Sequence, residues 1–257
     1  MIYDFVFVVL VYRNTKDLKE FFESLKISNS KVVVVNSFYD EETKTAFQTI
    51  AEQNNADFIN VENKGYGYGN NRGCEYALKN YDFKYLIISN ADIEIQKLDV
   101  AQLSDNQITA PEIITLKGKK QNPYRPYNIP FIDKMQYFGY NHQLKLPVFF
   151  IIAINKIARI FFRLFHLHGK IYSAHGAFII IPNALLKRVL PIYNEKMFLF
   201  AEEEHFAKVM HKNGFDIYFD SSIVIKHKED GSTSGLNVFE HTRNSFLEYY
   251  KTWYTKQ

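Results

Sequence analysis

The sequence predicts an α/β fold in which a mixed, mostly parallel β-sheet is flanked by helices and carries an inserted amphipathic helical region. Short apolar runs rich in β-branched and aromatic residues alternate with segments whose apolar residues recur at helical spacing. Near-continuous apolar strands of this kind are typical of parallel sheets covered on both faces. With 257 residues, 47% of them hydrophobic, the chain can bury one sizeable core, so we expect a single domain over residues 1–257.

The amino-terminal half shows this alternation most regularly. The run FVFVVLVY at 5–12 predicts the first strand, and apolar residues at helical spacing up to Leu25 predict the helix that follows it. The next predicted elements are a strand at 31–36, a helix at 41–54, a strand at 57–61, a helix at 70–80 and a strand at 84–89. Because ligands of such sheets bind beyond the carboxyl ends of the strands, the polar residues just after each strand are the first site candidates.

The pattern changes after about residue 110. Five prolines between 111 and 147 predict a long ordered loop or subdomain without regular elements over most of that range. The predicted elements after it are strands at 176–182, 216–220 and 223–227 and helices at 202–214 and 238–254. We therefore divide the domain into a first half at 1–101, an insertion at 111–170 and a second half at 171–257.

Composition narrows the classes of function. The formal net charge of +3 is small and the basic residues are scattered, which does not favour nucleic-acid binding. Cys74 is the only cysteine, so an internal disulfide and a cysteine-based zinc site are excluded, and a small buried apolar role is expected for it. The apolar run at 5–12 lacks a basic leader and a small-residue cleavage site. We therefore expect a buried strand there and a cytoplasmic protein.

The strand at 84–89 is followed by two polar residues that share a face, Asn90 and Asp92. A carboxylate at this edge could meet both a divalent cation and a diphosphate, an arrangement common in nucleotide sites with Mg²⁺ or Mn²⁺. The glycines of GYGYGNNRG, residues 65–73, would let backbone approach a ligand, and Arg72 could add positive charge. The alternatives are a turn or cap role for Asp92 and a plain helix entry for the glycine-rich loop.

The order of these segments resembles the inverting family 2 glycosyltransferases of the GT-A fold, in the branch that includes bacterial rhamnosyltransferases and similar polysaccharide-assembly enzymes. The resemblance covers roughly residues 5–101 and 172–250. Its motifs are VVLVYRNTKDLKEFFESL, VVVVNSFYDEET, NKGYGYGNNRGCEYAL, LIISNADIEI, FLFAEEEHFAKVMHKNGFDI and IKHKEDGST, the last with a late histidine and a Gly-Ser turn. It implies transfer of a sugar from a dTDP- or UDP-linked donor to a glycan or polyprenol-linked acceptor in bacterial surface polysaccharide or capsule synthesis.

The resemblance also implies roles for particular residues. Asp92 and His227 would hold a divalent metal, Mn²⁺ or Mg²⁺, and through it the diphosphate. Glu203 matches the general base that takes a proton from the acceptor hydroxyl, with Glu202 as the alternative. The residues expected to contact the nucleotide sugar are Tyr12, Asn14, Asn36, Asn63, Gly65, Gly69, Asn71, Arg72, Asn90 and Asp92.

Three positions depart from the family pattern. Asn90 replaces the first acid of the usual Asp-x-Asp motif, which weakens the expectation of metal dependence. Asn36 stands where an Asp usually reads the nucleotide base, which leaves the base preference open, and His205 replaces a further common acid. The acidic triplet at 202–204 would also suit a solvated helix start. Two other classes stay open: a nucleotidyltransferase on a similar sheet, which should carry a glycine-rich basic signature after the first strand, and a non-catalytic membrane-associated binding module.

The segment LPVFFIIAINKIARIFFRLFHLH, residues 146–168, lies outside the resemblance. Lys156, Arg159, Arg163 and His166 fall on one helical stripe and the other face is aliphatic and aromatic, which predicts an amphipathic helix. The polar interruptions make it a poor transmembrane span. We expect the basic stripe to meet an anionic membrane, where a polyprenol-linked acceptor would be found. The alternative is packing on the protein's own core or in a homodimer.

Overall fold

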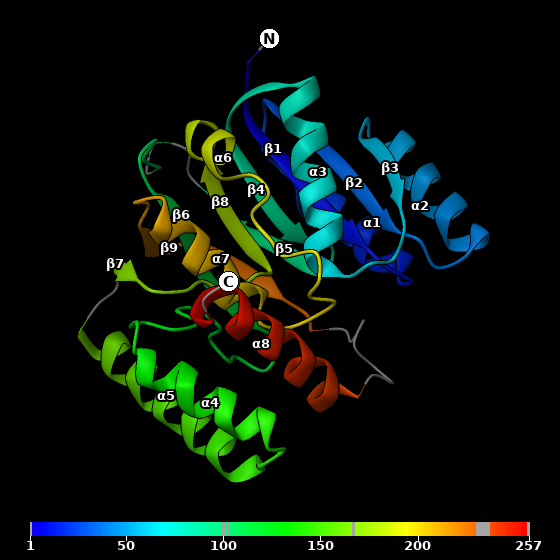
Figure 1. The fold of residues 1–257 in the computed structure, drawn as a ribbon. Helices are drawn as coiled ribbons and strands as arrows, with labels where there is room; N and C mark the ends of the chain where they lie inside the picture. Colours follow the sequence, from blue (N-terminus) through cyan, green and yellow to red (C-terminus); the bar gives the residue numbers. More distant parts are fainter. Residues whose placement is uncertain (1, 99–100, 102, 166–167, 230–236, 256–257) are drawn as a thin grey trace.

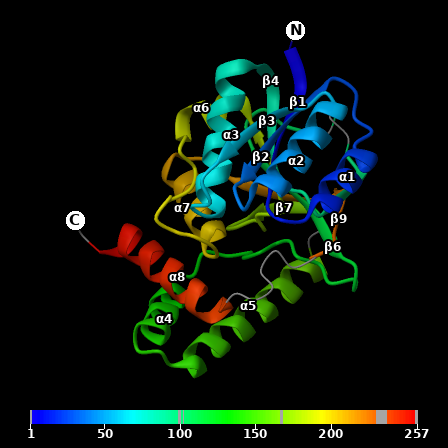
Figure 2. The same ribbon diagram turned by 90° about the vertical axis from the view of Figure 1, so that its right-hand side faces the viewer.

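The computed structural model describes residues 2–98, 101, 103–165, 168–229 and 237–255. Within these residues, nine strands form one mixed sheet in the order β3-β2-β1-β4-β8-β6-β9-β5, with β7 paired to β9. Helices cover both faces of the sheet (Figures 1 and 2). The predicted α/β class, with a mixed sheet flanked by helices, is confirmed.

Strands and helices alternate through the first half of the chain, as the sequence predicts. The strands are β1 (Ile2–Val11), β2 (Ser30–Ser37), β3 (Asp57–Val61), β4 (Asp82–Asn90), β5 (Ile93–Lys97), β6 (Ile108–Thr115), β7 (His168–Ile171), β8 (Phe178–Pro182) and β9 (Ile217–His227). The helices are α1 (Thr15–Ser24), α2 (Glu41–Gln53), α3 (Tyr66–Asn80), α4 (Pro130–Asn141), α5 (Lys145–Phe165), α6 (Asn183–Val189), α7 (Glu202–Lys212) and α8 (Val238–Tyr254).

Both faces of the sheet are buried, which explains the near-continuous apolar strands. Along β1, Val6 and Val8 belong to a core that includes residues of α3, α6 and α7. Their neighbours Phe5 and Phe7 belong to a second core, on the other face, with residues of α1 and α2. Successive side chains of a strand point to opposite faces, so each apolar residue of this run has a core to enter.

Strand directions decide which residues meet at one edge. β3, β2, β1 and β4 run parallel, whereas β8 is antiparallel to β4. The carboxyl ends of the parallel strands therefore share an edge with the start of β8. That edge is the expected place for a ligand in an open α/β sheet.

The prediction that 111–147 lacks regular elements over most of its length is wrong in two places. β6 passes through Pro111, and the pairing of β6 with β9 shifts register between Pro111 and Glu112, which accommodates the proline. α4 begins at Pro130, a first helical position where the missing N–H is not needed. The two short strands predicted at 216–227 are one strand, β9.

Helix α3 begins at Tyr66, four residues before the predicted start, and so contains most of the glycine-rich loop. Its glycines allow close packing on the sheet. A Cβ at Gly69 would lie 2.5 Å from Leu10 Cδ1, and one at Gly73 would lie 2.3 Å from Val8 Cγ1. The glycines inside this helix therefore serve helix–sheet contact.

Helices α4 and α5 form a hairpin below the sheet, and α8 lies against α4 (Figures 1 and 2). α5 is the predicted amphipathic helix. None of the helices within the described ranges combines the length and apolar character that crossing a membrane requires.

The polar stripe of α5 does not point where the sequence suggested. Arg159 donates to backbone carbonyls at 120–121, and Arg163 pairs with Glu112 of strand β6. Burial lowers the pKa of Arg159, and the neighbouring Arg163 adds to this effect. The prediction of an outward basic stripe is wrong for both arginines, because buried carbonyls on the inner side satisfy their donors. His166 lies outside the described residues.

Candidate active site

A cavity of about 490 Å³ lies at the edge where the parallel strands end and β8 begins. Its volume is in the range usual for small-molecule sites, ~300–1,000 Å³. Of the residues predicted for the site, it is lined by Tyr12, Asn14, Asn63, Gly65, Asn90, Asp92, Glu202, Glu203 and His227. The structure thus brings the metal candidates and the base candidates to one cavity. The predicted residues that do not line it are Asn36, Gly69, Asn71 and Arg72.

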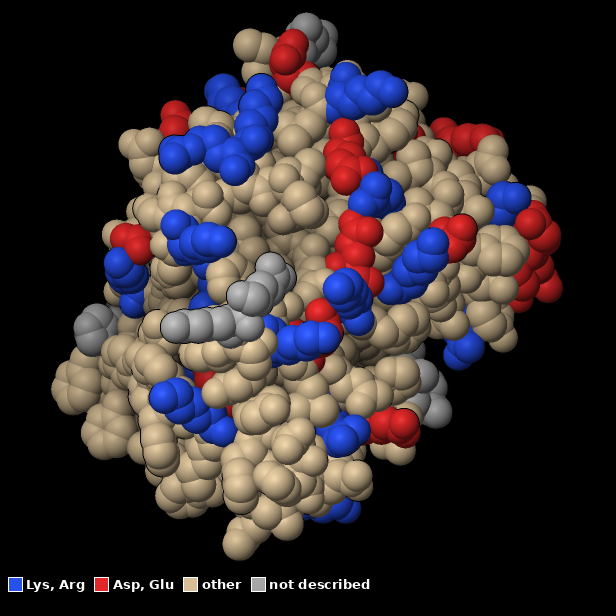
Figure 3. All heavy atoms as spheres, viewed as in Figure 1, with Lys and Arg blue, Asp and Glu red and all other residues tan. Residues whose placement is uncertain are grey.

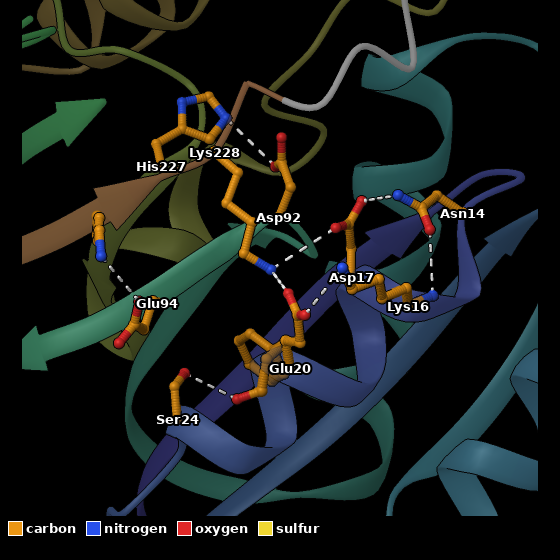
Figure 4. A network of polar contacts seen from close by, with 11 residues as sticks. Asn14, Lys16, Asp17, Glu20, Ser24, Asp92, Glu94, His227 and Lys228 are labelled. Carbon is orange, nitrogen blue, oxygen red and sulfur yellow. Dashed lines mark hydrogen bonds and ion pairs between the residues drawn. The ribbon is translucent and has the colours of Figure 1, made fainter. Parts of the chain in front are cut away.

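Asp92 and His227 form a pair on one wall, with His227 Nε2 3.2 Å from Asp92 Oδ1 (Figure 4). On the other side of the ring, Nδ1 lies 2.7 Å from Gln121 Oε1. Gln121 Nε2 donates to Glu229 Oε1 over 2.8 Å, which fixes the amide so that its carbonyl faces the histidine. Nδ1 therefore donates to Gln121, and Nε2 is left facing the carboxylate.

This donor set suits a divalent cation. A carboxylate oxygen and an imidazole nitrogen converge, and a second hydrogen bond orients the ring, as is usual for metal-binding histidines. The parts of the chain that the structure describes hold no cluster of three or more acidic, His or Cys side chains placed for a metal. Asp92 and His227 would therefore supply two protein ligands, leaving the other positions to ligand oxygens and water.

A polar network continues from this pair to α1 (Figure 4). The backbone N–H of Lys228 donates to the carbonyl of Asp92 over 2.9 Å. The side-chain Nζ of Lys228 pairs with Glu20 and lies 3.7 Å from Asp17 Oδ1. Asn14, which caps α1, donates to Asp17 over 2.6 Å. Asp17 also lines the cavity, but it was not predicted, because it lies inside a helix and not at the end of a strand.

The acidic residues on another wall are held by a strained turn. Phe200 and Ala201 have φ of 74° and 64°, in the left-handed region that non-glycine residues seldom adopt. Glu202 and Glu203 then open α7 with both side chains at the cavity. Strain of this kind persists where the surrounding structure imposes it, often at functional sites.

Burial separates the roles of the two carboxyls. It raises the pKa of Glu203, and hydrogen bonds that include the backbone amide of Gly176 act in the opposite direction. Burial raises the pKa of Glu202 much further, and the charge of Glu203 adds to that effect. The larger upward shift at Glu202 favours Glu203 as the carboxyl that ionises more readily, which fits Glu203 as a proton acceptor. Glu204, which burial brings to a pKa of about 7, does not line the cavity.

His175 is a cavity residue that the sequence did not indicate. Burial lowers its pKa to about 3, so its ring is neutral. Its Nδ1 accepts from the backbone N–H of Ala177 over 3.1 Å, which leaves Nε2 as the donor. His175 precedes β8, and it enters the site because β8 runs antiparallel to β4. A rule that selects residues following parallel strands therefore does not select His175.

The nucleotide-contact candidates outside the cavity have structural partners. Asn71 is buried, and its Nδ2 donates to the carbonyl of Tyr193 over 2.9 Å. Arg72 pairs with Glu75 at 2.8 Å and with Glu195. These contacts fasten the start of α3 to the segment before α7.

Asn36 is buried at the end of β2, where its Nδ2 donates to Asn60 Oδ1 over 2.7 Å. The next residue, Ser37, does line the cavity and donates to Asn63 Oδ1 over 3.1 Å. The cavity face here is thus one residue later than predicted, because successive strand residues alternate in direction.

Arg13, one of the polar residues expected after the first strand, lines the cavity. Its guanidinium lies 4.8 Å from the ring centroid of Tyr12 and 4.3 Å from that of Tyr39. A cation stacked between aromatic rings can meet phosphate or a base edge. A positive φ of 65° gives Arg13 an uncommon backbone conformation at this turn.

Gly65 is the glycine of the loop on which the site most depends, and Gly65→Ala should unfold more readily and lose activity. Its φ is 106°, and an added Cβ would lie 2.1 Å from the carbonyl oxygen of Phe198, in the turn before the acidic residues. We expect a loss of at least ~3 kcal/mol in the free energy of unfolding, measured by denaturant titration. Gly118→Ala is the matched control: its φ is 75° with nothing within 4 Å, so only ~1 kcal/mol is expected. Equal losses in the two variants would contradict the assignment.

Helix α5 supports the chain segment that brings two further residues, Gln121 and Tyr124, to the cavity. Asn155 donates to the carbonyl of Tyr124 over 2.9 Å, and Arg159 donates to that of Gln121 over 3.0 Å. Both Gln121 and Tyr124 line the cavity. The sequence could not reveal these residues, because the proline-rich segment that carries them has no period and is fixed by a helix distant in the sequence.

Comparison with known proteins gives few sequence matches. No family model matches the chain. Over 125 residues it is 26% identical to the low-salt glycan biosynthesis hexosyltransferase Agl10 of Haloferax volcanii, which covers 46% of this chain and 39% of that protein. The chain thus spans about two fifths of that relative's length.

Solved structures give broader matches. The chain is similar to TarS of S. aureus (TM-score 0.56, 15% identity, 88% of this chain and 36% of that one). It is also similar to GalNAc-T7, solved with UDP, GalNAc and Mn²⁺ (TM-score 0.59, 11% identity, 88% of this chain and 44% of that one). A third similar structure is the mannosyltransferase PcManGT from Pyrobaculum calidifontis in complex with GDP-Man and Mn²⁺ (TM-score 0.54, 12% identity, 91% of this chain and 59% of that one). At these identities the likeness concerns the fold, and the chain is therefore similar in fold to the GT-A glycosyltransferases.

Proposed function

We propose that this protein is a metal-dependent, inverting glycosyltransferase that moves a sugar from a nucleoside-diphosphate donor to an acceptor hydroxyl. The observation that carries the proposal is the cavity itself. It joins the Asp92–His227 pair on one wall to Glu202 and Glu203 on another, at the ligand-binding edge of a sheet with this fold. The similarity to a hexosyltransferase, and to structures solved with nucleotides and Mn²⁺, supports the same assignment.

The residues present account for the chemical requirements of inverting transfer. Glu203 takes the proton from the acceptor hydroxyl as that oxygen attacks the anomeric carbon from the side opposite the diphosphate. Asp92 and His227 would hold a divalent cation, which when bound offsets the negative charge of the leaving diphosphate. His175 is neutral, and its Nε2 could donate a hydrogen bond to the ligand from the same wall of the cavity.

The donor site is proposed at the ends of β1 and β2. Tyr12, Arg13 and Tyr39 form an aromatic and cationic shelf, and Ser37 and Asn63 offer polar groups beside it. By the family resemblance, the donor would be dTDP- or UDP-linked and the sugar a hexose or rhamnose. The acceptor would be a glycan or polyprenol-linked glycan of bacterial surface polysaccharide synthesis, met on the cytoplasmic side of the membrane.

A panel of nucleotide sugars tests the proposal. Release of free nucleoside diphosphate from one donor, several-fold faster with Mn²⁺ than with a chelator, is the expected result, because the enzymes of this class hydrolyse their donor slowly without an acceptor. Release of pyrophosphate from a nucleoside triphosphate and a sugar phosphate would instead indicate a nucleotidyltransferase. Donor binding without hydrolysis or transfer to any acceptor would indicate a non-catalytic module.

A further inference from the structure

The outward side of α5 is a continuous apolar surface. Leu146, Phe149, Ile157, Ile160, Phe161 and Leu164 lie on one helical face, and each is more than half exposed. Phe131 and Phe138 extend the surface onto α4. We call these eight residues the apolar face. Scattered exposed apolar residues are ordinary, but a contiguous set of this size marks an interaction surface.

The opposite side of α5 packs against the rest of the protein. Val148, Ile151 and Phe162 are buried, and Asn155 and Arg159 hydrogen-bond inward. Every polar group that could have faced outward along the middle of the helix is therefore turned in, except Lys156. The apolar face is therefore not needed to pack α5 on the protein, because other residues of the helix already make that contact.

We propose that the apolar face docks on an anionic lipid surface, with α5 lying in the plane of the interface. Charge favours this partner: Lys134, Lys145 and Lys156 are exposed on the two helices. The only acid between 130 and 165 is Asp133, which is fully buried and paired with Arg125 at 2.7 Å. Figure 3 shows this lower part of the surface as mostly uncharged, with isolated basic side chains. Cations beside an inserted apolar helix face suit anionic headgroups.

A second copy of the chain fits the same surface less well. A two-fold contact would place the same patch on both sides. Such a contact would bring Lys145 and Lys156 of both copies to one interface, where the only carboxylate of α4 and α5, Asp133, is buried and already paired with Arg125. The hairpin also forms the lower end of the molecule in both views (Figures 1 and 2), where a flat lipid surface could reach it.

Docking would place the cavity next to the membrane. The inner side of α5 binds the segment that carries Gln121 and Tyr124, both of which line the cavity. A helix with its side chains is ~10–12 Å across, so the cavity wall would lie about one helix diameter from the lipid. Reaching a lipid-linked acceptor from there rests on the proposed function, whereas docking itself does not.

Co-sedimentation with phosphatidylcholine vesicles, with and without phosphatidylglycerol, tests the proposal. The parent protein should bind the anionic vesicles and be released as salt rises, because the charge attraction is screened. Phe149→Gln, Phe161→Gln and Leu164→Gln combined should reduce the partition coefficient at least ~100-fold, since three large side chains no longer enter lipid. Lys145→Gln with Lys156→Gln should reduce it roughly fivefold per lysine.

Controls separate the alternatives. Ile2→Gln replaces an exposed apolar residue at the opposite end of the molecule and should bind as the parent does (Figure 1). Equal binding of the triple variant, or no binding of the parent to anionic vesicles, overturns the proposal. A parent dimer that becomes a monomer in the triple variant, without vesicle binding, assigns the face to a second copy. Donor hydrolysis without vesicles should be the same in the parent and in the triple variant. If neither protein hydrolyses any donor, that result contradicts the proposed function and leaves the docking proposal unaffected.

Discussion

Glu203→Gln is expected to lower sugar transfer by at least ~10²-fold while donor and metal affinity stay close to those of the parent. Glutamine keeps the shape of the side chain and removes the proton acceptor, and a general base typically contributes ~10²–10⁴-fold in rate. Transfer should be measured with saturating donor, and binding by calorimetry. Parental transfer by this variant would reduce the acidic segment to a helix start.

Glu202→Gln is the matched control. Burial and the charge of Glu203 raise the pKa of Glu202 well above its ordinary value, which makes it the poorer proton acceptor, so the variant should lose much less activity. The reverse order of effects would make Glu202 the base. A third variant, Glu204→Gln, tests whether proximity alone matters, because Glu204 adjoins the pair without lining the cavity.

The pH profile supplies a second readout for Glu203. Only its ionised form can accept a proton, so transfer should fall as pH drops through its pKa. Burial raises that pKa above the ordinary glutamate value, which moves the acid limb of the profile to higher pH than an exposed glutamate would give. Glu203→Gln should lack this limb.

The period of apolar residues predicted most of the sheet and several helices because each of these elements is fixed by its own burial. Strand β3 and helix α8 were predicted at the bounds that the structure shows. The errors arise where long-range packing decides. Gly67 and Gly69, which suggested a loop, lie inside α3, where they allow close approach to Tyr193 and to Leu10 of β1. Pro111 suggested an interruption, yet a register shift keeps it within β6.

For the site, the rule about strand ends and the family resemblance each pointed to some of the residues that line the cavity, and neither pointed to His175 or Asp17. Asn90 and Asp92 come from a rule about strand ends, whereas His175 depends on the antiparallel direction of β8, which no local pattern reveals. Periodicity likewise showed that Arg159 and Arg163 share a face of α5, but it cannot tell which way a face points. The direction of this face is set by the backbone carbonyls of Gln121 and Asn122, about forty residues away in the sequence, to which the two arginines donate.

Asp92→Ala is expected to weaken Mn²⁺-dependent donor binding by at least ~100-fold, because it removes the carboxylate of the proposed two-residue metal site and leaves His227 alone. The fold should persist, since the carboxylate faces the cavity and its loss removes no core contact. Calorimetry with donor in Mn²⁺ and in a chelator measures the effect. Asp92→Asn, which keeps the shape and the hydrogen-bonding capacity, should show the same loss of metal dependence if charge is what the cation requires.

Glu94→Ala separates this effect from a general change in charge. Glu94 follows Asp92 by two residues, pairs with Lys226 at 3.6 Å on the outside, and does not line the cavity. Its removal alters the net charge as Asp92→Ala does, so donor affinity should stay at the parental value. Unchanged affinity of Asp92→Ala in Mn²⁺ would refute the metal assignment. Because Asn90 replaces the other acid of the motif, Asp92 is the one carboxylate left there to bind the cation, and no neighbour on that turn could mask its loss.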